Sequence, residues 1–278
     1  MTPLQDFLRQ DEPCPGFRRL AARFHGHAYD PHRHDCYAVG VTVDGVQEFH
    51  YRGAVRASST GQTMVLHPDE AHDGHAGIED GFTYRMLYVD PALICAALDG
   101  APPPFVRDVV ARDDELAAIV AEAFEDFPHA LAPLAMDGLI ARLADSLDRR
   151  SDRRPQRPGA RHSFAAAERA RQLLEESTDP AISSAELEQV TGLDRYALAR
   201  AFRAAFGSSP HRYLVAKRVA RAQRLLTAGA GLADAAAGAG FADQSHFTRH
   251  FKAHLGLTPG PLYQPAARRL RCAIFRTE

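Results

Sequence analysis

The segment ADQSHFTRHFKAH, from Ala242 to His254, has the pattern of a short amphipathic helix. Its apolar residues recur at helical spacing and form one stripe: Phe247, Phe251 and Leu255. Polar residues cover the other faces: Gln244, Ser245, His246, Thr248, Arg249 and Lys252. Gln, Ser, Thr and Arg side chains read base edges or bind phosphates in a major groove. The segment is a candidate recognition helix, although any solvated amphipathic helix also carries polar residues outside.

An internal duplication favours the DNA-binding interpretation. At a constant offset of 49 residues, Leu198, Phe202, Phe206, Gly207, Arg200 and Pro210 recur as Phe247, Phe251, Leu255, Gly256, Arg249 and Pro259. Each copy follows a short helical segment and a Gly turn: Ser184 to Val190 before Gly192, and Leu232 to Gly238 before Gly240. Helix, tight turn and helix is the order of a helix-turn-helix motif. Ser183 or Ser184 can cap the earlier helix.

A single long helix is predicted between the two copies, from Pro210 to Ala228, with proline in its first turn and Gly229 just past its end. Nineteen residues span roughly 28 Å, so this rod can place two recognition helices about one DNA turn apart. Its outward side carries basic residues, which we expect near phosphates: Arg212, Lys217, Arg218, Arg221 and Arg224.

These motifs resemble the AraC/XylS family of transcription regulators over about the last hundred residues before the tail. The resemblance is carried by GFADQSHFTRHFKAHLGLTP, by SSPHRYLVAKRVARAQRLL and by GLDRYALARAFRAAFG. It implies DNA contacts from the exposed positions of both recognition helices: Arg195, Tyr196, Ala199, Arg200, Gln244, Ser245, His246, Thr248 and Arg249. Ala199 offers no polar group, and Ala235 stands where the family usually has a larger aliphatic residue.

Charge divides the chain into two halves. Residues 1–148 hold 11 basic and 24 acidic residues, a balance of −13, whereas residues 149–278 hold 22 and 11, a balance of +11. A positive domain is the electrostatic footprint of a nucleic-acid binder. At 278 residues the chain is long enough for two domains, each with its own core.

No long apolar run or signal segment is present, so we expect a cytoplasmic protein that does not enter a membrane. The four cysteines lack metal-ligand spacing, which suits a reducing compartment: Cys14, Cys36, Cys95 and Cys272.

The N-terminal half has the pattern of short strands. Tyr37 to Val43 and Val46 to Tyr51 flank Asp44-Gly45, which predicts a two-residue hairpin turn. Further strands are expected at Met64 to His67 and Phe82 to Val89, so a small sandwich or barrel is favoured. PHRHDCYAVGVTVDG and GQTMVLHPDEAHDG resemble the two edges of a cupin barrel, the usual sensing domain in ligand-responsive members of the family.

Histidines in this half suggest either a metal site or a ligand pocket. His32, His34 and His72 occupy positions where catalytic cupins hold a metal, but Ala38 and Val39 stand where those enzymes place a glutamate. His67 and His75, or Asp69 and Glu70, could substitute only in a rearranged site. We therefore expect no metal and no cofactor. A barrel of this size can enclose one small molecule, and the expected effector contacts are His32, His34, Tyr37 and His72.

Two helices are predicted next. Leu116 to Phe127 begins at Asp113 or Asp114 and ends at Pro128, and Leu131 to Leu147 follows. They resemble the family's dimerisation element, or they pack on the barrel. Arg149 to His162 has the composition of a linker, after which Ser163 is expected to cap a helix from Phe164 to Glu176.

The predicted fold class is α+β with two domains: a cupin-like β-barrel followed by antiparallel helices, and an all-α double helix-turn-helix domain. The expected boundaries are 1–90 (effector sensing), 91–148 (helical, possible dimerisation), 149–162 (linker), 163–264 (DNA binding) and 265–278 (basic tail).

The favoured function is a sequence-specific transcription regulator, an activator responsive to a small-molecule effector and not an enzyme. Its expected partners are double-stranded promoter DNA, the effector, RNA polymerase and a second copy of the chain. One alternative is a metal-dependent cupin enzyme fused to a DNA-binding domain. Another is a regulator whose barrel serves only dimerisation or protein contacts.

Overall fold

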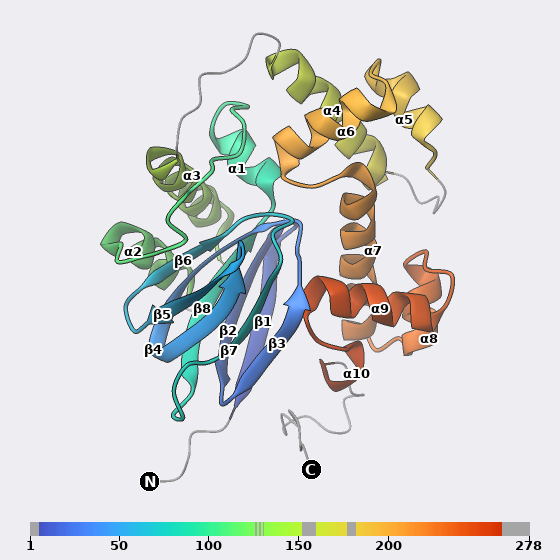
Figure 1. The fold of residues 1–278 in the computed structure, drawn as a ribbon. Coiled ribbons are helices and arrows are strands. Elements are labelled where there is room, and N and C mark those ends of the chain that lie inside the picture. The colour runs from blue at the N-terminus through green and yellow to red at the C-terminus, as the bar shows by residue number, and fades with distance from the viewer. Residues whose placement is uncertain are drawn as a thin grey trace.

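The computed structural model describes residues 6–125, 127, 129, 131–151, 160–176 and 182–262. The N-terminal part is rich in strands, and helices α1, α2 and α3 lie beside them (Figure 1). The C-terminal part is helical and is arranged around the long helix α7. The strands are β1 (Phe7–Cys14), β2 (Phe17–Phe24), β3 (His27–His32), β4 (Tyr37–Tyr51), β5 (Ala54–Ser59), β6 (Thr63–Leu66), β7 (His72–Ala76), β8 (Phe82–Val89) and β9 (Val110–Ala111). The helices are α1 (Pro91–Ala97), α2 (Asp114–Ala123), α3 (Pro133–Arg150), α4 (Ala160–Glu176), α5 (Ser184–Thr191), α6 (Arg195–Phe206), α7 (Pro210–Thr227), α8 (Leu232–Gly238), α9 (Gln244–Leu255) and α10 (Pro259–Leu262).

The strands form an antiparallel barrel-like sandwich in which β4 belongs to both layers. One layer has the order β1-β2-β8-β4-β6-β9, and the other contains β3, β7, β4 and β5. The first half of β4 pairs with β6 and β8, and its second half pairs with β5 and β7.

The predicted hairpin at Asp44-Gly45 is wrong. Both residues lie inside the continuous strand β4, where the register against β8 shifts between Thr42 and Asp44. Gly45 has φ +76, and a Cβ there would lie 2.0 Å from the Gly81 carbonyl oxygen. The glycine therefore serves a bulge that carries one strand from the first layer into the second, because only glycine tolerates both the positive φ and the close backbone.

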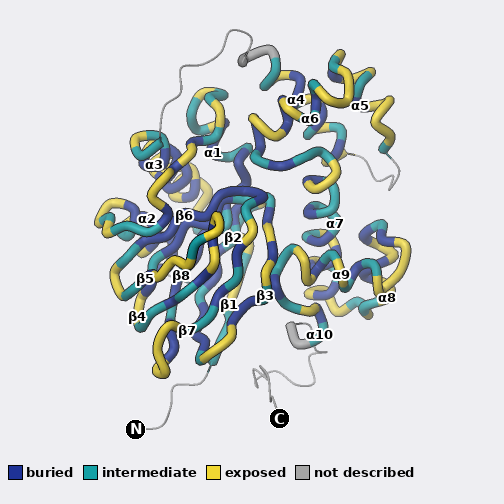
Figure 2. Tube along the Cα trace, viewed as in Figure 1, coloured by how far each residue is buried: buried dark blue, intermediate teal, exposed yellow. Residues whose placement is uncertain are grey.

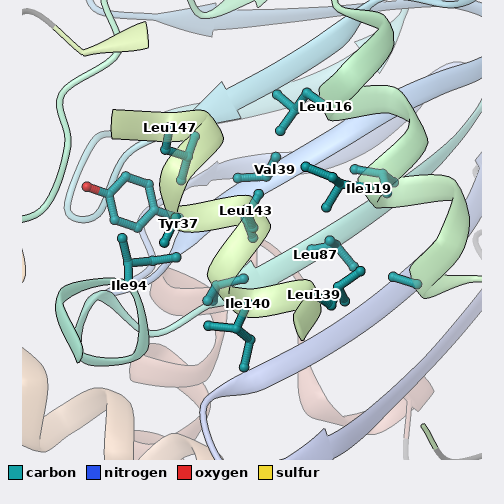
Figure 3. Packing of buried hydrophobic residues seen from close by; sticks show 14 of the residues in the cluster. Tyr37, Val39, Leu87, Ile94, Leu116, Ile119, Leu139, Ile140, Leu143 and Leu147 are labelled. Carbon is teal, nitrogen blue, oxygen red and sulfur yellow. The ribbon is translucent and has the colours of Figure 1, made fainter. Parts of the chain in front are cut away.

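Two apolar cores fill this half of the protein. The core inside the barrel includes Phe24, Phe49, Met64 and Tyr84. The other lies between the outer face of the first layer and helices α1, α2 and α3, and Figure 3 shows its packing around Leu143. Each of the two predicted helices thus buries its apolar stripe on the sheet, and the expected stripe residues Met136, Ile140, Leu143 and Leu147 are all buried.

The C-terminal helices build two separate cores on the two halves of α7. The first core joins α4, α5, α6 and the start of α7 around Phe202, Phe206 and Tyr213. The second joins the end of α7 to α8 and α9 around Phe247 and Phe251. Figure 2 shows buried residues at these contacts and exposed residues along the outer turns of α5 and α8. The predicted double helix-turn-helix arrangement is confirmed.

Helix ends follow the sequence signals at α5 but not at α3 and α4. The Ser183 side chain accepts a hydrogen bond from the Glu186 amide and completes a capping box, so Ser183 rather than Ser184 is the cap. The predicted cap at Ser163 is wrong, since α4 already begins at Ala160 and Ser163 lies within its first turn. Arg149 and Arg150 were expected in the linker, but they form the last turn of α3 and pair with Glu115.

The rest of the expected linker, residues 152–159, lies outside the described residues, as does the basic tail with Cys272. Cys14, Cys36 and Cys95 are free thiols. Within the described ranges, no helix combines the length and apolar character needed to cross a bilayer.

Candidate functional site

Helix α6 presents the polar side chains that were predicted to contact DNA. Its first turn is fixed by Asp194, whose carboxylate accepts hydrogen bonds from the Tyr196 and Ala197 amides. Arg195, Tyr196 and Arg200 are exposed, whereas the opposite face is buried. Tyr196 leaves 70% of its surface in solvent, which is unusual for a large aromatic residue and leaves its ring free to meet a partner.

Helix α9 repeats this design. Asp243 caps it by accepting from the His246 amide, while Gln244, Ser245 and Arg249 are exposed and Thr248 is half-buried.

His246 differs from its neighbours on α9. Its ring packs on Phe241 and His250 at centroid distances of 5.6 and 4.6 Å. Its Nε2 lies 2.9 Å from His250 Nε2, and its Nδ1 is buried. The His246 ring is therefore packed on its neighbours, unlike the three exposed residues Gln244, Ser245 and Arg249.

The basic residues of α7 divide into two groups. Arg212 pairs with Asp69, and Lys217 Nζ lies 3.1 Å from Asp90 Oδ2, so both contact carboxylates of the N-terminal domain. Arg221 and Arg224 are exposed. The expectation that the whole row lies near phosphates is therefore wrong for Arg212 and Lys217 in this arrangement, because the rod faces the sheet domain on that side.

The structure brings His32, His34 and His72 together and leaves Tyr37 out. Ring centroids are 4.3 Å apart for His32 and His72, 4.7 Å for His34 and His72, and 6.2 Å for His32 and His34. Tyr37 packs among the residues under α1 and α3 (Figure 3). Its hydroxyl donates to the Pro104 carbonyl at 2.6 Å. Side chains alternate along a strand, so Tyr37 faces the helices and its neighbour Ala38 faces the barrel.

Backbone carbonyls fix the tautomer of each clustered histidine. The Nδ1 atoms of His32, His34 and His72 lie 2.9, 2.8 and 3.0 Å from the carbonyl oxygens of Asp30, Cys36 and Glu70. A carbonyl oxygen only accepts, so each neutral ring donates from Nδ1 and keeps a lone pair on Nε2. Burial lowers the pKa of His32 to about 3 and also lowers the pKa values of His34 and His72. The cluster is neutral at pH 7.

A small cavity of about 30 Å³ adjoins this cluster where the barrel meets α9. It is lined by His32 and His34 together with Leu8, Gln10, Arg18, Leu20, Tyr29, Tyr88, Gln223, His254, Leu255 and Leu257. Two buried atoms on its wall lack a hydrogen-bond partner among the described residues: Arg18 Nε and His34 Nε2. Gln10, Arg18, Tyr88, Gln223 and His254 also line a cleft of about 1120 Å³ between the two domains.

The sequence did not reveal that this cavity is shared between domains. Arg18 and Tyr88 lie on β2 and β8, whereas His254 belongs to the recognition helix α9. Local patterns carry no information about such distant contacts. His67 and His75, the possible substitutes, lie elsewhere: His67 accepts from the Val106 amide, and His75 lies 3.4 Å from Glu48. Among the described residues, no group of three or more His, Cys, Asp or Glu side chains could hold a metal ion.

The buried histidines predict a loss of stability in acid. The ordinary histidine pKa is 6.5, and burial lowers that of both His32 and His254 to about 3. Between these values the unfolded chain binds protons that the folded chain does not. Stability is therefore fully present above pH 6.5 and falls by about 1.4 kcal/mol per pH unit and per group below it. Urea unfolding at pH 7.5, 6.0 and 5.0 measures this slope. His32→Asn should flatten it, the exposed-site variant His27→Asn should not, and equal slopes in both would contradict the assignment.

Two helix-turn-helix units beside a sheet domain, with a small cavity of mixed polar and apolar lining at their junction, define a DNA-binding regulator with a ligand-binding domain. Residues 15–144 match the family model described as AraC-like ligand binding domain, and residues 187–263 match a helix-turn-helix domain. The chain belongs to the AraC family of transcription regulators.

Known proteins resemble the chain over most of its length. An uncharacterized HTH-type transcriptional regulator, YbfI of Bacillus subtilis (strain 168), is 27% identical over 250 residues, which covers 87% of this chain and 90% of YbfI. ToxT from Vibrio cholerae shares the fold with a TM-score of 0.60 at 10% identity, covering 88% of this chain and 96% of ToxT. ToxT bound to an unsaturated fatty acid gives a TM-score of 0.57 at 12% identity, covering 94% and 100%.

Proposed function

We propose that the chain reads promoter DNA with seven side chains on two helices. They are Arg195, Tyr196 and Arg200 on α6, and Gln244, Ser245, Thr248 and Arg249 on α9. The observation that carries the proposal is the repeated helix in which the apolar face is buried and six of these seven side chains are exposed. His246 was expected in the same set, but its ring is packed, and we assign it to orienting the start of α9.

Capture of genomic DNA tests this function. The purified full-length chain is incubated with sheared DNA from its own genome, and the retained fragments are sequenced. A regulator of this type should enrich a small set of promoter fragments that share two short conserved elements about one helical turn apart. Enrichment without a shared element would remove sequence-specific binding from the proposal.

We infer that the effector binds at the junction cavity, with His32 and His34 as contacts and the ring of His72 packed against both. Arg18 Nε is a donor without an acceptor, and His34 Nε2 is an acceptor without a donor. A hydroxyl group, or a carboxyl group in its protonated form, supplies both partners at once, whereas an ionised carboxylate supplies only the acceptor for Arg18. Leu8, Leu20 and Leu255 give the same cavity an apolar wall. The effector proposed here is a partly apolar molecule with a hydroxyl or carboxyl group, and its entry widens the cavity toward the larger cleft. ToxT has been solved with (E)-4-(8-methylnaphthalen-1-yl)but-3-enoic acid, a ligand of this class.

Thermal shift against a library of hydroxylated and carboxylated metabolites tests the effector proposal. A ligand at 100 times its Kd should stabilise the protein by about 2.7 kcal/mol. The variant His34→Leu should abolish the shift, because it removes the unpaired acceptor, while His27→Asn on the exposed surface should retain it. A hit that shifts His34→Leu as much as the unmodified protein would place the effector elsewhere.

The remaining partners rest on the family resemblance. We propose cytoplasmic action, activation of transcription, contact with RNA polymerase and a homodimer. Helices α2 and α3 bury one stripe on the sheet, and Leu134 at the start of α3 is 84% exposed, which leaves an apolar residue for a second copy. The metal-dependent enzyme alternative lacks a ligand set among the described residues, so it has no support from the site. The other alternative is a regulator whose barrel serves only dimerisation or protein contacts. The thermal-shift experiment distinguishes it from an effector-binding regulator.

A further inference from the structure

The N-terminal domain contacts both helix-turn-helix units at the same position of the repeat. Gly207 ends α6 and Gly256 ends α9, and the two glycines are equivalent at the offset of 49 residues. A Cβ on Gly207 would lie 2.6 Å from Pro68 Cβ, and a Cβ on Gly256 would lie 2.8 Å from His32 Nδ1. The C-terminal end of each recognition helix therefore meets the sheet domain at van der Waals distance.

A second pair of equivalent residues adds a charge to each contact. Arg203 and Lys252 also differ by 49 residues, and each lies one turn before its glycine. Arg203 Nη2 lies 2.5 Å from Asp69 Oδ2, and Lys252 Nζ lies 2.7 Å from Asp30 Oδ2. The hydrogen bond from Lys252 lowers the pKa of Asp30. In each unit, therefore, one cation pairs with an aspartate of the N-terminal domain and one glycine packs closely against that domain, and the two aspartates are different.

Further contacts reinforce both points. At the first, Arg212 also pairs with Asp69, whose side chain is only 5% exposed. At the second, the Arg33 amide donates to the Ala253 carbonyl at 3.0 Å, so β3 and the segment after it follow the end of α9. A buried carboxylate shared by two arginines and a backbone hydrogen bond between domains both need a defined geometry.

These contacts matter because the two units share no core. Tyr213 belongs to the first core and Val219 to the second, and α7 is the element common to both. The relative direction of the two recognition helices therefore depends on α7 and on how each unit packs against its own half of this helix. The N-terminal domain contacts the C-terminal ends of both recognition helices, so it adds a further constraint on their relative direction.

We propose that the N-terminal domain carries two docking points of one design, Pro68-Asp69 and Asp30-His32, which hold the two recognition helices in one relative orientation. The partner of this surface is the duplicated helix end of the chain's own DNA-binding domain. Because Arg195, Tyr196, Arg200, Gln244, Ser245 and Arg249 stay exposed in the docked state, the surface orients the helices rather than covering their DNA-reading faces. His32 also lines the junction cavity. If the proposed effector site holds, a ligand there acts directly on the second docking point.

Glycine variants with a built-in control test the docking points. Gly192, Gly207 and Gly256 all end helices with φ between +71 and +72, so alanine causes similar backbone strain at each. A Cβ on Gly192 meets nothing within 4 Å, whereas those on Gly207 and Gly256 meet the N-terminal domain. Only the last two variants disturb the contact between domains.

The measurement is a distance distribution between the two units. Spin labels are attached to cysteines introduced at the exposed residues Gln189 on α5 and Ala233 on α8, with Cys14, Cys36 and Cys272 changed to serine. Double electron–electron resonance is recorded on the full chain without DNA or effector. We expect one narrow distribution for the unmodified protein and for Gly192→Ala. The double variant Gly207→Ala/Gly256→Ala should lose the narrow peak.

A second set of variants, which removes charges instead of adding a Cβ, tests the docking points if the glycine variants fail to fold. Asp30→Asn/Asp69→Asn should broaden the distribution, whereas Glu115→Gln/Glu122→Gln, which removes ion pairs on α2 and α3, should not. Unchanged distributions in both docking variants would overturn the proposal. The distance distribution is measured without DNA or effector, so it tests the docking points even if the proposed function is wrong. Genomic DNA capture by the same proteins tests that function separately.

Discussion

Replacing Phe247 with alanine is expected to unfold the second helix-turn-helix unit and abolish specific DNA binding. Phe247 is fully buried, with its ring 5.3 Å from that of Phe241 and 5.4 Å from that of Phe251. Truncating a buried phenylalanine costs about 3–5 kcal/mol, because apolar burial is lost and a cavity remains. The small second core has few other large residues to absorb that loss, since Ala222, Ala235, Ala236 and Ala239 make up much of the rest.

Urea unfolding followed by circular dichroism measures the effect of Phe247→Ala. The matched control is Tyr196→Ala, which truncates an aromatic residue that is 70% exposed. This control should weaken DNA binding while leaving the free energy of unfolding almost unchanged, whereas Phe247→Ala should lower both. A Phe247→Ala protein that keeps both its stability and its promoter binding would refute the assignment of α9 to a packed recognition unit.

The second large effect is expected from the equivalent arginines Arg200 and Arg249. Each is exposed on its recognition helix and lies at the same position of the repeat. Loss of a base contact should cost about 1–3 kcal/mol and relax specificity at one base position, which differs between the two variants. Electrophoretic mobility shifts on a panel of single-base operator variants give both quantities at fixed salt.

Arg56→Ala is the control for these arginine variants, because Arg56 is exposed on β5 in the N-terminal domain. It removes the same charge from the protein without touching either helix. If Arg200→Ala and Arg249→Ala bind every operator variant as the control does, neither arginine reads a base.

The repeated motif could be predicted from sequence because its information is local. The predicted rod, Pro210 to Ala228, matches α7 within one residue, and the serine and glycine signals bracketed α5, which runs from Ser184 to Thr191. Helical periodicity, capping residues and left-handed glycines depend on residues that are close in the chain, so they can be recognised in the sequence.

The N-terminal half shows where local signals fail. Asp44-Gly45 has the composition of a hairpin turn, yet the pairing of β4 with four other strands turns it into a bulge. The sequence predicts Tyr37 as an effector contact together with the histidines, but the strand's alternation places it on the opposite face. In both cases the partners across the sheet decide the outcome, and they are distant in the chain.

The contacts between domains were not predictable for the same reason. Asp69 and Arg212 are 143 residues apart, and nothing near either residue marks the other as its partner. The basic row on α7 was therefore assigned to phosphates as a whole. Only the structure separates the residues that face the sheet domain from Arg221 and Arg224, which stay exposed.

The most direct test of the account is a hydroxyl-radical footprint of the full-length chain on a captured promoter fragment, combined with methylation interference at guanines. Two recognition helices in neighbouring major grooves predict two protected segments on one face of the duplex, with interference sites centred about 10 base pairs apart. Arg249→Ala should erase interference in one segment and Arg200→Ala in the other. A single protected segment that responds equally to both variants would contradict side-by-side insertion of the two helices.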